Sequence, residues 1–538
     1  MSEMTHKAGR AAFGKAIDIA LQHRDKDWEQ DAERLLDLMQ KYMSGAKLEF
    51  DYDRAKERIC DREGTLNRYV RRILAETDPH VLRTTALNLG FEAFFHGTRT
   101  IRKMRGIHQC NIPWLILMDP TSACNLHCTG CWAAEYGNRL NLSFEEMDDV
   151  IRQGKELGIY FYMFTGGEPL VRKADLIRLC EKHNDCAFLA YTNGTLVDEA
   201  FCQEMKRAGN LYLAISLEGF EAVNDLRRGS GVYGKVMHAM ELLKGNGLLF
   251  GTSICYTSRN IEAVTSDEFV DLLIEKGCRY ALYFHYMPVG NEAAVELLPT
   301  VEQRVRMMAR VREIRNMTTG KGLFTMDFQN DGEFVGGCIA GGRNYFHINA
   351  NGDAEPCVFI HYSDANIRTH TLLEILKQPL FMAYRENQPF NENHLRPCPM
   401  LENPEILERI VKETGARSTD LQSPESAEHL CAKCHEYAAG WAPAADRLWG
   451  ESRSRTDQLW KEGGACTDQL WKEGRAQTDQ LWKEGGAQTD QQHEICRSSK
   501  TVSQIGCAGK AGAGKSRRGK KENHEKEKYE TCQMAAGQ

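Results

Sequence analysis

Apolar runs and amphipathic stretches alternate along the chain between residues 115 and 315. The apolar runs have the length and character of buried strands, and the stretches between them have helical periodicity. We expect strands at residues 115–119, 160–165, 187–192, 211–217, 249–256 and 280–287. This alternation predicts an α/β fold built from a parallel βα array.

The first helix of the array has a defined start and end in the sequence. Ser143 is followed three residues later by Glu146, which is a capping-box pattern, and Gly158 is placed to end the helix. Six strand-helix units are fewer than a complete eight-stranded barrel needs, so we expect a partial (β/α)6 barrel over residues 111–325. The C-terminal ends of its strands should carry the chemistry.

The first 110 residues have helical patterning, with helices expected at 31–43, 66–76 and 87–105. The last helix gathers apolar side chains on or near one face, namely Leu87, Phe91, Phe94, Phe95 and Ile101. Its end is basic, with Arg99, Arg102, Lys103 and Arg105. Two interpretations stay open: a helix on a membrane surface, or a helix whose apolar face packs on the barrel bottom. Few alternating β runs occur, which counts against a winged peptide-recognition domain.

Residues 447–538 differ in character from the rest of the chain. An 11-residue repeat, Thr-Asp-Gln-Leu-Trp-Lys-Glu-Gly, places Trp449, Trp460, Trp471 and Trp482 in register. The glycine in each unit weakens a continuous helix, so we expect a weakly structured tail. A literal match to a phosphate-binding loop ends at Ser516, but no hydrophobic strand precedes it and basic residues follow, so we expect no nucleotide site there.

Composition narrows the class of protein. The chain has 538 residues, 42% hydrophobic residues and a net charge of −7, which suits a multi-domain enzyme and argues against nucleic-acid binding. It has no apolar stretch long enough to span a membrane and no signal-peptide pattern, so we expect a cytoplasmic protein. Nineteen cysteines in such a protein indicate metal ligation together with ordinary buried thiols.

Three of these cysteines have a spacing that carries chemistry. Cys124, Cys128 and Cys131 follow the first strand in a C-x3-C-x2-C pattern, which can hold three corners of a [4Fe–4S] cluster and leave the fourth iron open. The turn Gly166-Gly167-Glu168-Pro169 follows the second strand. Its glycines allow close approach of the backbone to a ligand, and its carboxylate can bind an ammonium group.

With these motifs the chain resembles the radical S-adenosylmethionine (SAM) superfamily from about Leu115 to Tyr437. The resemblance implies that the three cysteines hold the cluster, that the open iron chelates SAM and that the 166–169 turn binds its amino group. It also implies that Ser216 and Glu218 reach the SAM ribose and that Arg228 contacts the SAM carboxylate. Asn193, after the third strand, joins this cofactor-binding set. The alternative is that these residues only cap turns at strand ends.

A second cysteine set follows the barrel: Cys338, Cys357, Cys398, Cys431 and Cys434. Residues 345–357 read as a β-hairpin that turns at Asn351-Gly352 and brings distant cysteines together. Residues 326–446 therefore resemble a SPASM domain, and five cysteines imply one auxiliary [4Fe–4S] cluster. We expect Cys338, Cys357 and Cys434 as ligands, with Cys398 or Cys431 as the fourth. A structural zinc site is the alternative.

The resemblance implies an oxidoreductase of the kind found in anaerobes. It reductively cleaves SAM to a 5′-deoxyadenosyl radical, which abstracts hydrogen from a substrate carbon, and it takes its electron from a reductant such as ferredoxin or flavodoxin. Candidate bases are Asp327, Asp331, Glu333 and His285. We expect a lipid acyl chain as substrate, with peripheral contact to the inner membrane surface. The alternatives are a maturase of a peptide or protein and, from another class, an iron–sulfur electron-transfer or scaffold protein.

Overall fold

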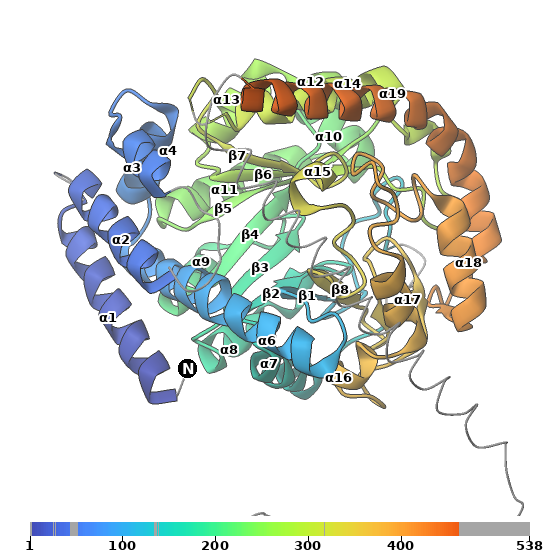
Figure 1. Cartoon of the computed structure of the whole chain (residues 1–538), viewed down its shortest axis with the longest axis horizontal. Coiled ribbons are helices and arrows are strands. Elements are labelled where there is room, and N and C mark those ends of the chain that lie inside the picture. Colours follow the sequence, from blue (N-terminus) through green and yellow to red (C-terminus); the bar gives the residue numbers. More distant parts are fainter. Residues whose placement is uncertain are drawn as a thin grey trace, which may run out of the picture. The chain divides into compact units, whose positions relative to one another are not determined.

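The fold is built on one nine-stranded sheet with the strand order β7-β6-β5-β4-β3-β2-β1-β8-β9. From β1 to β7, strands that are consecutive in the chain are neighbours in the sheet. The computed structural model describes residues 3–24, 26, 28–43, 52–133, 137, 139–316 and 318–461 (Figure 1). The first seven strands are parallel: β1 (Leu115–Met118), β2 (Phe161–Phe164), β3 (Ala187–Thr192), β4 (Leu211–Ser216), β5 (Phe250–Tyr256), β6 (Tyr280–His285) and β7 (Phe324–Asp327). The sheet confirms the six predicted strands and adds β7.

Helices separate the strands, as a βα array requires. They are α7 (Phe144–Leu157), α8 (Lys173–Lys182), α9 (Glu199–Ala208), α10 (Glu221–Arg228), α11 (Val232–Gly245), α12 (Ile261–Thr265), α13 (Asp267–Glu275) and α14 (Val301–Ile314), with short 3₁₀ turns η3 (Pro169–Arg172) and η4 (Val295–Leu297). The capping box at Ser143 and the left-handed glycine at 158 are both present, as predicted.

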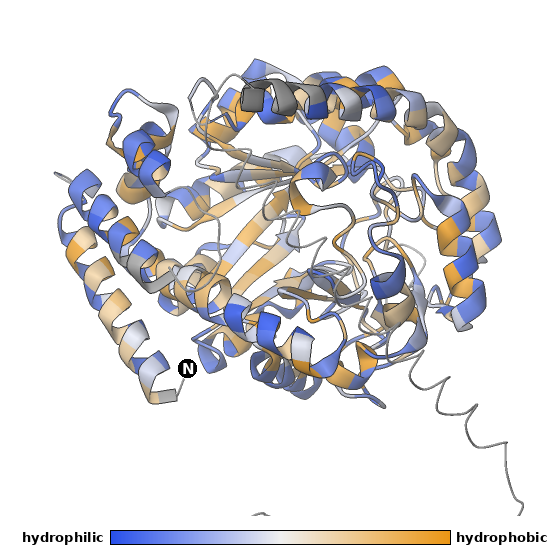
Figure 2. Cartoon of the chain, viewed as in Figure 1, coloured by the Kyte–Doolittle hydropathy of each residue, from blue (hydrophilic) through white to orange (hydrophobic). Residues whose placement is uncertain are grey.

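The strands of the sheet are largely hydrophobic (Figure 2), and their side chains alternate between two apolar clusters. One cluster fills the space between the strands and helices and includes Ala281 and Tyr283 of β6. The other lies on the inner face of the sheet and includes Leu282 together with Leu189 and Tyr212 of neighbouring strands. A side chain on a strand therefore faces either the helices or the interior, and neighbours in sequence face opposite ways.

The C-terminal part continues the same sheet. Strand β8 (Tyr345–Ile348) pairs in parallel with β1, and β9 (Ala354–Glu355) pairs antiparallel with β8, which confirms the predicted hairpin. The remaining elements are α15 (Gly332–Val335), α16 (Leu372–Ile375), α17 (Pro379–Asn387), α18 (Pro404–Thr414), α19 (Ala427–Lys461), β10 (Tyr362–Ser363) and β11 (Arg417–Ser418). The expected boundary after residue 325 falls inside β7, so the sheet runs through it.

The N-terminal region is helical, as predicted. It contains α1 (Glu3–Gln22), α2 (Trp28–Met43), α3 (Tyr52–Cys60), α4 (Thr65–Glu76), α5 (Pro79–Thr85), a π-helix η1 (Ala86–Gly97) and α6 (Thr98–His108). Ala93 of η1 packs in the interior cluster, and its carbonyl accepts a hydrogen bond from the indole of Trp114, just before β1. The π-helix therefore packs against the N-terminal end of the strands.

The basic end of α6 is partly built into the structure. The Arg105 guanidinium donates to the carbonyl oxygens of Ile112 and Arg343, and burial together with the nearby Arg343 charge lowers the pKa of Arg105 to about 10. Of the two interpretations of this helix, these contacts favour packing on the barrel, because Arg105 binds carbonyl oxygens of the protein and not a membrane surface. Within the described residues, no helix is long and apolar enough to cross a membrane. The tryptophan repeats beyond residue 461 lie outside the described part of the chain.

Candidate active site

The loop that carries Cys124, Cys128 and Cys131 follows β1 and is clamped by the turn after β2. The amide of Gly167 donates to the Thr121 carbonyl at 3.0 Å, and the amide of Glu168 donates to the Ala123 carbonyl at 2.8 Å. A Cβ atom on Gly167 would stand 2.4 Å from the Ala123 oxygen, so only glycine allows this approach. The two sequence motifs thus form one unit.

The three thiols share one small region. Burial, with smaller contributions from the charges of Glu168, Cys131 and Cys128, raises the pKa of Cys124 to about 11. Burial also raises the pKa of Cys128, although the Arg228 guanidinium, 3.9 Å from its sulfur, opposes the shift. Three thiols gathered in one loop suit a cluster whose iron takes thiolate ligands and displaces the protons. The donor set fits a [4Fe–4S] cluster with three protein ligands.

The carboxylate of Glu168 ties neighbouring strand ends together. It is buried and accepts hydrogen bonds from the Thr192 hydroxyl at 2.6 Å, the Asn193 amide at 2.7 Å and the Leu170 amide at 2.9 Å. The Asn193 side chain donates in turn to Asn125 in the cysteine loop at 2.8 Å. Because both carboxylate oxygens already accept donors of the protein, the main role of Glu168 here is to position the loops.

A second polar group lies at the ends of β4 and α10. Glu218 is fully buried and pairs with Arg227 at 2.6 Å and with Arg228, whose Nε stands 3.0 Å away. The Arg227 carbonyl accepts from the Thr129 amide, which fastens α10 to the cysteine loop. Ser216 ends β4 and is half-buried. The structure therefore brings Glu218 and Arg228 to the cluster cysteines, with Glu218 holding the arginine.

Two of the candidate bases, His285 and Asp327, have hydrogen-bond partners within the protein. His285 follows the interior residue Phe284 and faces outward, where its Nε2 contacts the Tyr437 hydroxyl of α19 at 2.6 Å. Asp327 likewise bonds to the side chain of Asn330 at 2.7 Å, and burial, with the charge of Asp331, raises its pKa to about 6.

The two other candidates form ion pairs on the helix side. Asp331 pairs with Arg315 at 2.5 and 2.8 Å, and Glu333 pairs with Arg312. A carboxylate whose oxygen atoms already pair with an arginine is poorly placed to take a proton from a substrate. The sequence singled out these residues by position along the chain, which does not reveal the face of the strand or loop that they occupy.

Aromatic rings gather where the interior of the barrel meets the C-terminal hairpin. Phe284 stacks on Phe328 with ring centroids 4.4 Å apart and meets Phe359 edge-on at 6.4 Å. Trp132, directly after Cys131, meets His347 of β8 edge-on at 5.9 Å and Phe359 at 6.2 Å. These rings join the loop of the first cysteine set to the C-terminal hairpin.

The buried imidazole of His347 pairs with a carboxylate through each of its two nitrogen atoms. Its Nδ1 lies 2.6 Å from Glu355, and its Nε2 lies 2.9 Å from Asp119 at the end of β1. Burial lowers the pKa of His347, but the two carboxylates outweigh this and raise the pKa to about 10. The imidazole is therefore charged at neutral pH and links the hairpin to β1.

The second cysteine set converges in one apolar cluster that contains all five of its members. The Tyr345 hydroxyl lies 2.8 Å from the Cys357 sulfur. The Tyr384 hydroxyl is buried without a hydrogen-bond partner among the described residues, and burial with the charges of four of these cysteines raises its pKa. This buried hydroxyl lacks an acceptor for its hydrogen bond. A sulfide of an iron–sulfur cluster bound among the thiols would supply that acceptor. The donor set fits an iron–sulfur cluster.

The five cysteines are not equivalent. The charges of Cys338 and Cys357 raise the pKa of Cys398, after burial and Glu402, so these three thiols lie close together. Glu402 also raises the pKa of Cys434, whereas Cys431 is influenced by Glu408 and other acidic residues.

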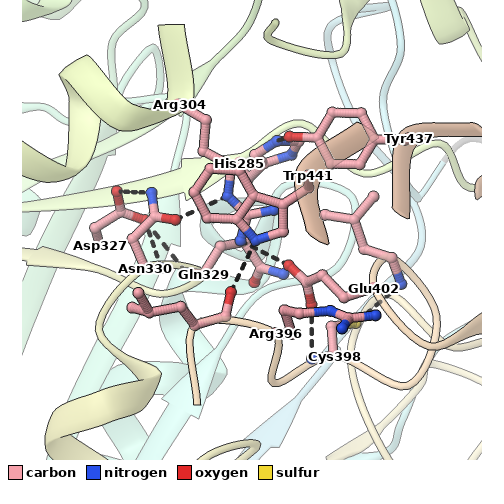
Figure 3. A network of polar contacts seen from close by, with 12 residues as sticks. His285, Arg304, Asp327, Gln329, Asn330, Arg396, Cys398, Glu402, Tyr437 and Trp441 are labelled. Carbon is pink, nitrogen blue, oxygen red and sulfur yellow. Dashed lines mark hydrogen bonds and ion pairs between the residues drawn. The ribbon is translucent and has the colours of Figure 1, made fainter. Parts of the chain in front are cut away.

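A buried polar network connects this region to the barrel (Figure 3). Arg304 of α14 pairs with Glu402 at 2.6 Å, and both side chains are fully buried. The other oxygen of Glu402 accepts the Cys398 amide at 2.7 Å. The Arg304 guanidinium lies over the Trp441 ring of α19 at 4.0 Å and donates to Asn330. Sequence analysis missed Arg304 and Glu402, because 98 residues separate them and neither belongs to a motif.

Two segments of the chain match known protein families, and each contains cysteines of one set. Residues 118–274 match the radical SAM superfamily, and residues 338–400 match SPASM, an iron–sulfur cluster-binding domain. The chain is 25% identical to Fe-coproporphyrin III synthase of Methanosarcina barkeri over 321 residues, 53% of this chain and 79% of the relative.

Two further relatives act on peptides or carry the name of a maturase. The chain is 26% identical to PqqA peptide cyclase of Granulibacter bethesdensis over 296 residues, 51% of this chain and 76% of the relative. It is 28% identical to mycofactocin maturase MftC of Mycolicibacterium smegmatis over 265 residues, 46% of this chain and 64% of the relative.

Proposed function

We propose that this chain, with its radical SAM and SPASM matches, is a radical SAM enzyme that modifies a peptide or protein at an unactivated carbon. The observation that carries the proposal is the pairing of β8 with β1, which fixes the second cysteine set relative to the first through one continuous sheet. An enzyme that only generated a radical would not need that second set. Relatives named as a peptide cyclase and as a maturase match this chain over 296 and 265 residues.

We assign roles to the residues at the first site as part of this proposal. Cys124, Cys128 and Cys131 hold the [4Fe–4S] cluster, and the turn of residues 166–169 orients SAM beside it. When bound, the cluster and SAM supply a 5′-deoxyadenosyl radical, for which a ferredoxin or flavodoxin provides the electron. Arg228 is placed to meet the SAM carboxylate, because its guanidinium lies 3.9 Å from the Cys128 sulfur.

Three further residues complete this site in the proposal. Glu218 fixes Arg228 in position through their buried ion pair. Ser216, at the end of β4, is placed to reach the SAM ribose. Asn193 acts on the cysteine loop through Asn125 and serves as a positioning residue.

At the second site we propose Cys338, Cys357, Cys398 and Cys434 as ligands of one auxiliary cluster. The mutual influence of the first three thiols and the shared neighbour Glu402 support this choice. Tyr345 and Tyr384 would donate hydrogen bonds to its sulfur atoms. The cluster would accept an electron from the substrate.

A flat aromatic substrate is a second candidate. The stacked Phe284 and Phe328 rings give the interior an aromatic wall, and a synthase of Fe-coproporphyrin III is among the relatives. A lipid acyl chain has weaker support, because Arg105 of the basic helix end is bonded to carbonyl oxygens of the protein.

The test offers three substrate classes to one anaerobically reconstituted enzyme. Short peptides encoded beside the gene, coproporphyrin and acyl lipids are incubated in parallel with SAM and dithionite. We expect a peptide to increase 5′-deoxyadenosine formation and to change in mass, while the other two do neither. Stimulation by coproporphyrin or by a lipid alone, with a matching mass change, would contradict the peptide proposal.

A further inference from the structure

A group of metal-ligating side chains lies at the N-terminal end of the barrel strands, opposite the end that carries Cys124, Cys128 and Cys131. His6 of α1 and Glu92 and His96 of the π-helix η1 each offer a ligand atom, and these three atoms lie within 4.8 Å of one another. Asn88 of the same π-helix donates to the carbonyls of Asn184 and Cys186, just before β3, so the group lies at the N-terminal end of the strands.

We propose that His6, Glu92 and His96 bind a divalent transition-metal ion, with zinc as its representative. Two imidazoles and one carboxylate are a ligand set that zinc uses in proteins, with a fourth position left for water. Nothing in the radical chemistry requires such a site. Its role would be structural, since it would fasten α1 to the π-helix that packs under the barrel.

The spacing of the ligand atoms suits zinc. Ligands about 2.1 Å from a tetrahedral ion stand about 3.4 Å from one another. The His6 Nε2 and Glu92 Oε2 atoms are 2.8 Å apart, and the widest separation in the group is within 4.8 Å. These separations are compatible with the required one, so small rotations of the side chains are sufficient to close the site.

The orientation of the carboxylate also suits a ligand. Glu92 is buried, and its Oε1 atom accepts from the Arg10 guanidinium at 2.6 Å, while Oε2 faces His6. Arg10 is held in turn by the Asn88 side chain at 2.8 Å. Outer partners of this kind fix the orientation of metal ligands. Arg10 would therefore act as a positioning residue for Glu92.

The backbone brings the two ligands of η1 to one face. Glu92 and His96 are four residues apart, which places them one above the other on a helix. The rings of His6 and His96 stack with centroids 4.0 Å apart, so α1 presents its imidazole beside that face. π-helical turns are rare and often occur at functional sites.

The experiment uses the full-length enzyme with its iron–sulfur clusters reconstituted. The protein is incubated with zinc, desalted against a weak chelator and analysed for zinc content and for X-ray absorption at the zinc edge. We expect about one zinc per chain, with nitrogen and oxygen ligands at about 2.0–2.1 Å and no sulfur at about 2.3 Å. Zinc should also raise the thermal unfolding temperature of the parent protein.

Three variants make the test specific. His6→Gln and His96→Ala should each lose the bound zinc and the thermal shift. His23→Ala, at a partly exposed histidine just after α1, should retain both. His6 is partly exposed, so His6→Gln keeps the test valid if His96→Ala disturbs the packing of η1.

Two outcomes would overturn the proposal. One is a parent protein that retains no zinc after desalting. The other is bound zinc with sulfur in its ligand shell, or zinc that survives both His6→Gln and His96→Ala, because the ion would then reside on cysteines. SAM cleavage serves as an independent readout, and we expect it to be unchanged in His6→Gln.

Discussion

Cys124 is the single residue whose loss should remove the chemistry. Replacing it with alanine leaves two thiols for a cluster that needs three, and the cluster iron would lack a ligand. We expect Cys124→Ala to abolish 5′-deoxyadenosine formation in anaerobic assays with dithionite. Cys60→Ala, at an exposed thiol of α3, is the matched control and should keep the parental rate. Equal turnover in both variants would exclude the assigned cluster site.

Arg304 is the residue whose loss should cost the most stability. Its partner Glu402 is fully buried, so Arg304→Met would leave an unpaired buried carboxylate and lower the free energy of unfolding by about 3 to 5 kcal/mol. Chemical denaturation of the reconstituted protein measures this. Arg306→Met, on the same helix, removes an exposed pair with Glu262 and should cost less than about 1 kcal/mol. A similar loss in both variants would refute the argument.

At the residue scale, the sequence signal is strongest where it is local. Cys124, Cys128 and Cys131 lie within one loop. Their spacing can therefore be recognised without knowing which distant residues pack around it. The candidate bases show the opposite case. His285 and its neighbour Phe284 face opposite sides of β6, so an error of one position changes the environment completely. Only the packed sheet decides which of the two faces the interior.

At the scale of elements, the turn after β2 and the cysteine loop should depend on each other. Gly167→Ala would place a Cβ atom 2.4 Å from the Ala123 carbonyl and force the loop away. We expect this variant to lose most of the iron of the first cluster on desalting, as measured by iron content and by electron paramagnetic resonance of the reduced protein.

Gly234→Ala is the matched control for that change. Gly234 lies in α11, where an added Cβ meets nothing within 4 Å, and alanine is the better helix former. The control should retain its iron and unfold at an equal or higher denaturant concentration. Loss of iron in the control as well would mean that the effect does not come from the contact with Ala123.

The elements themselves were predictable to different degrees. Periodicity located β1 to β6 because each is a continuous apolar run. It missed β7, a four-residue strand whose two ends, Phe324 and Asp327, differ in polarity. It located the hairpin of β8 and β9 through Asn351-Gly352, but the pairing of β8 with β1 joins residues about 230 apart and has no local signal.

On the scale of the whole molecule, two separate clusters should be countable. The proposed ligand sets predict about eight irons per chain, four for each cluster. The triple variant Cys124→Ala, Cys128→Ala and Cys131→Ala should retain about half of that iron. If the triple variant binds no iron, the second cysteine set holds another metal or none, and the proposed electron acceptor is lost.

Two truncations test how far the functional molecule extends. All cysteines assigned to the two clusters lie between residues 124 and 434, and α19 continues to Lys461. A chain ending at Lys461 should therefore keep its iron and its SAM cleavage. A chain ending at Gly440 would lose Trp441, whose fully buried ring covers the Arg304 guanidinium and whose indole donates to the Leu395 carbonyl.

The shorter truncation should expose the Arg304–Glu402 pair to water and weaken the segment that carries Cys398. We expect it to lose iron from the second cluster and to unfold at a lower temperature, while the longer one matches the parent in both measurements. Parental iron content in the chain ending at Gly440 would show that α19 beyond Cys434 is dispensable. Loss of SAM cleavage on removal of residues 462–538 would show instead that the repeats take part in function.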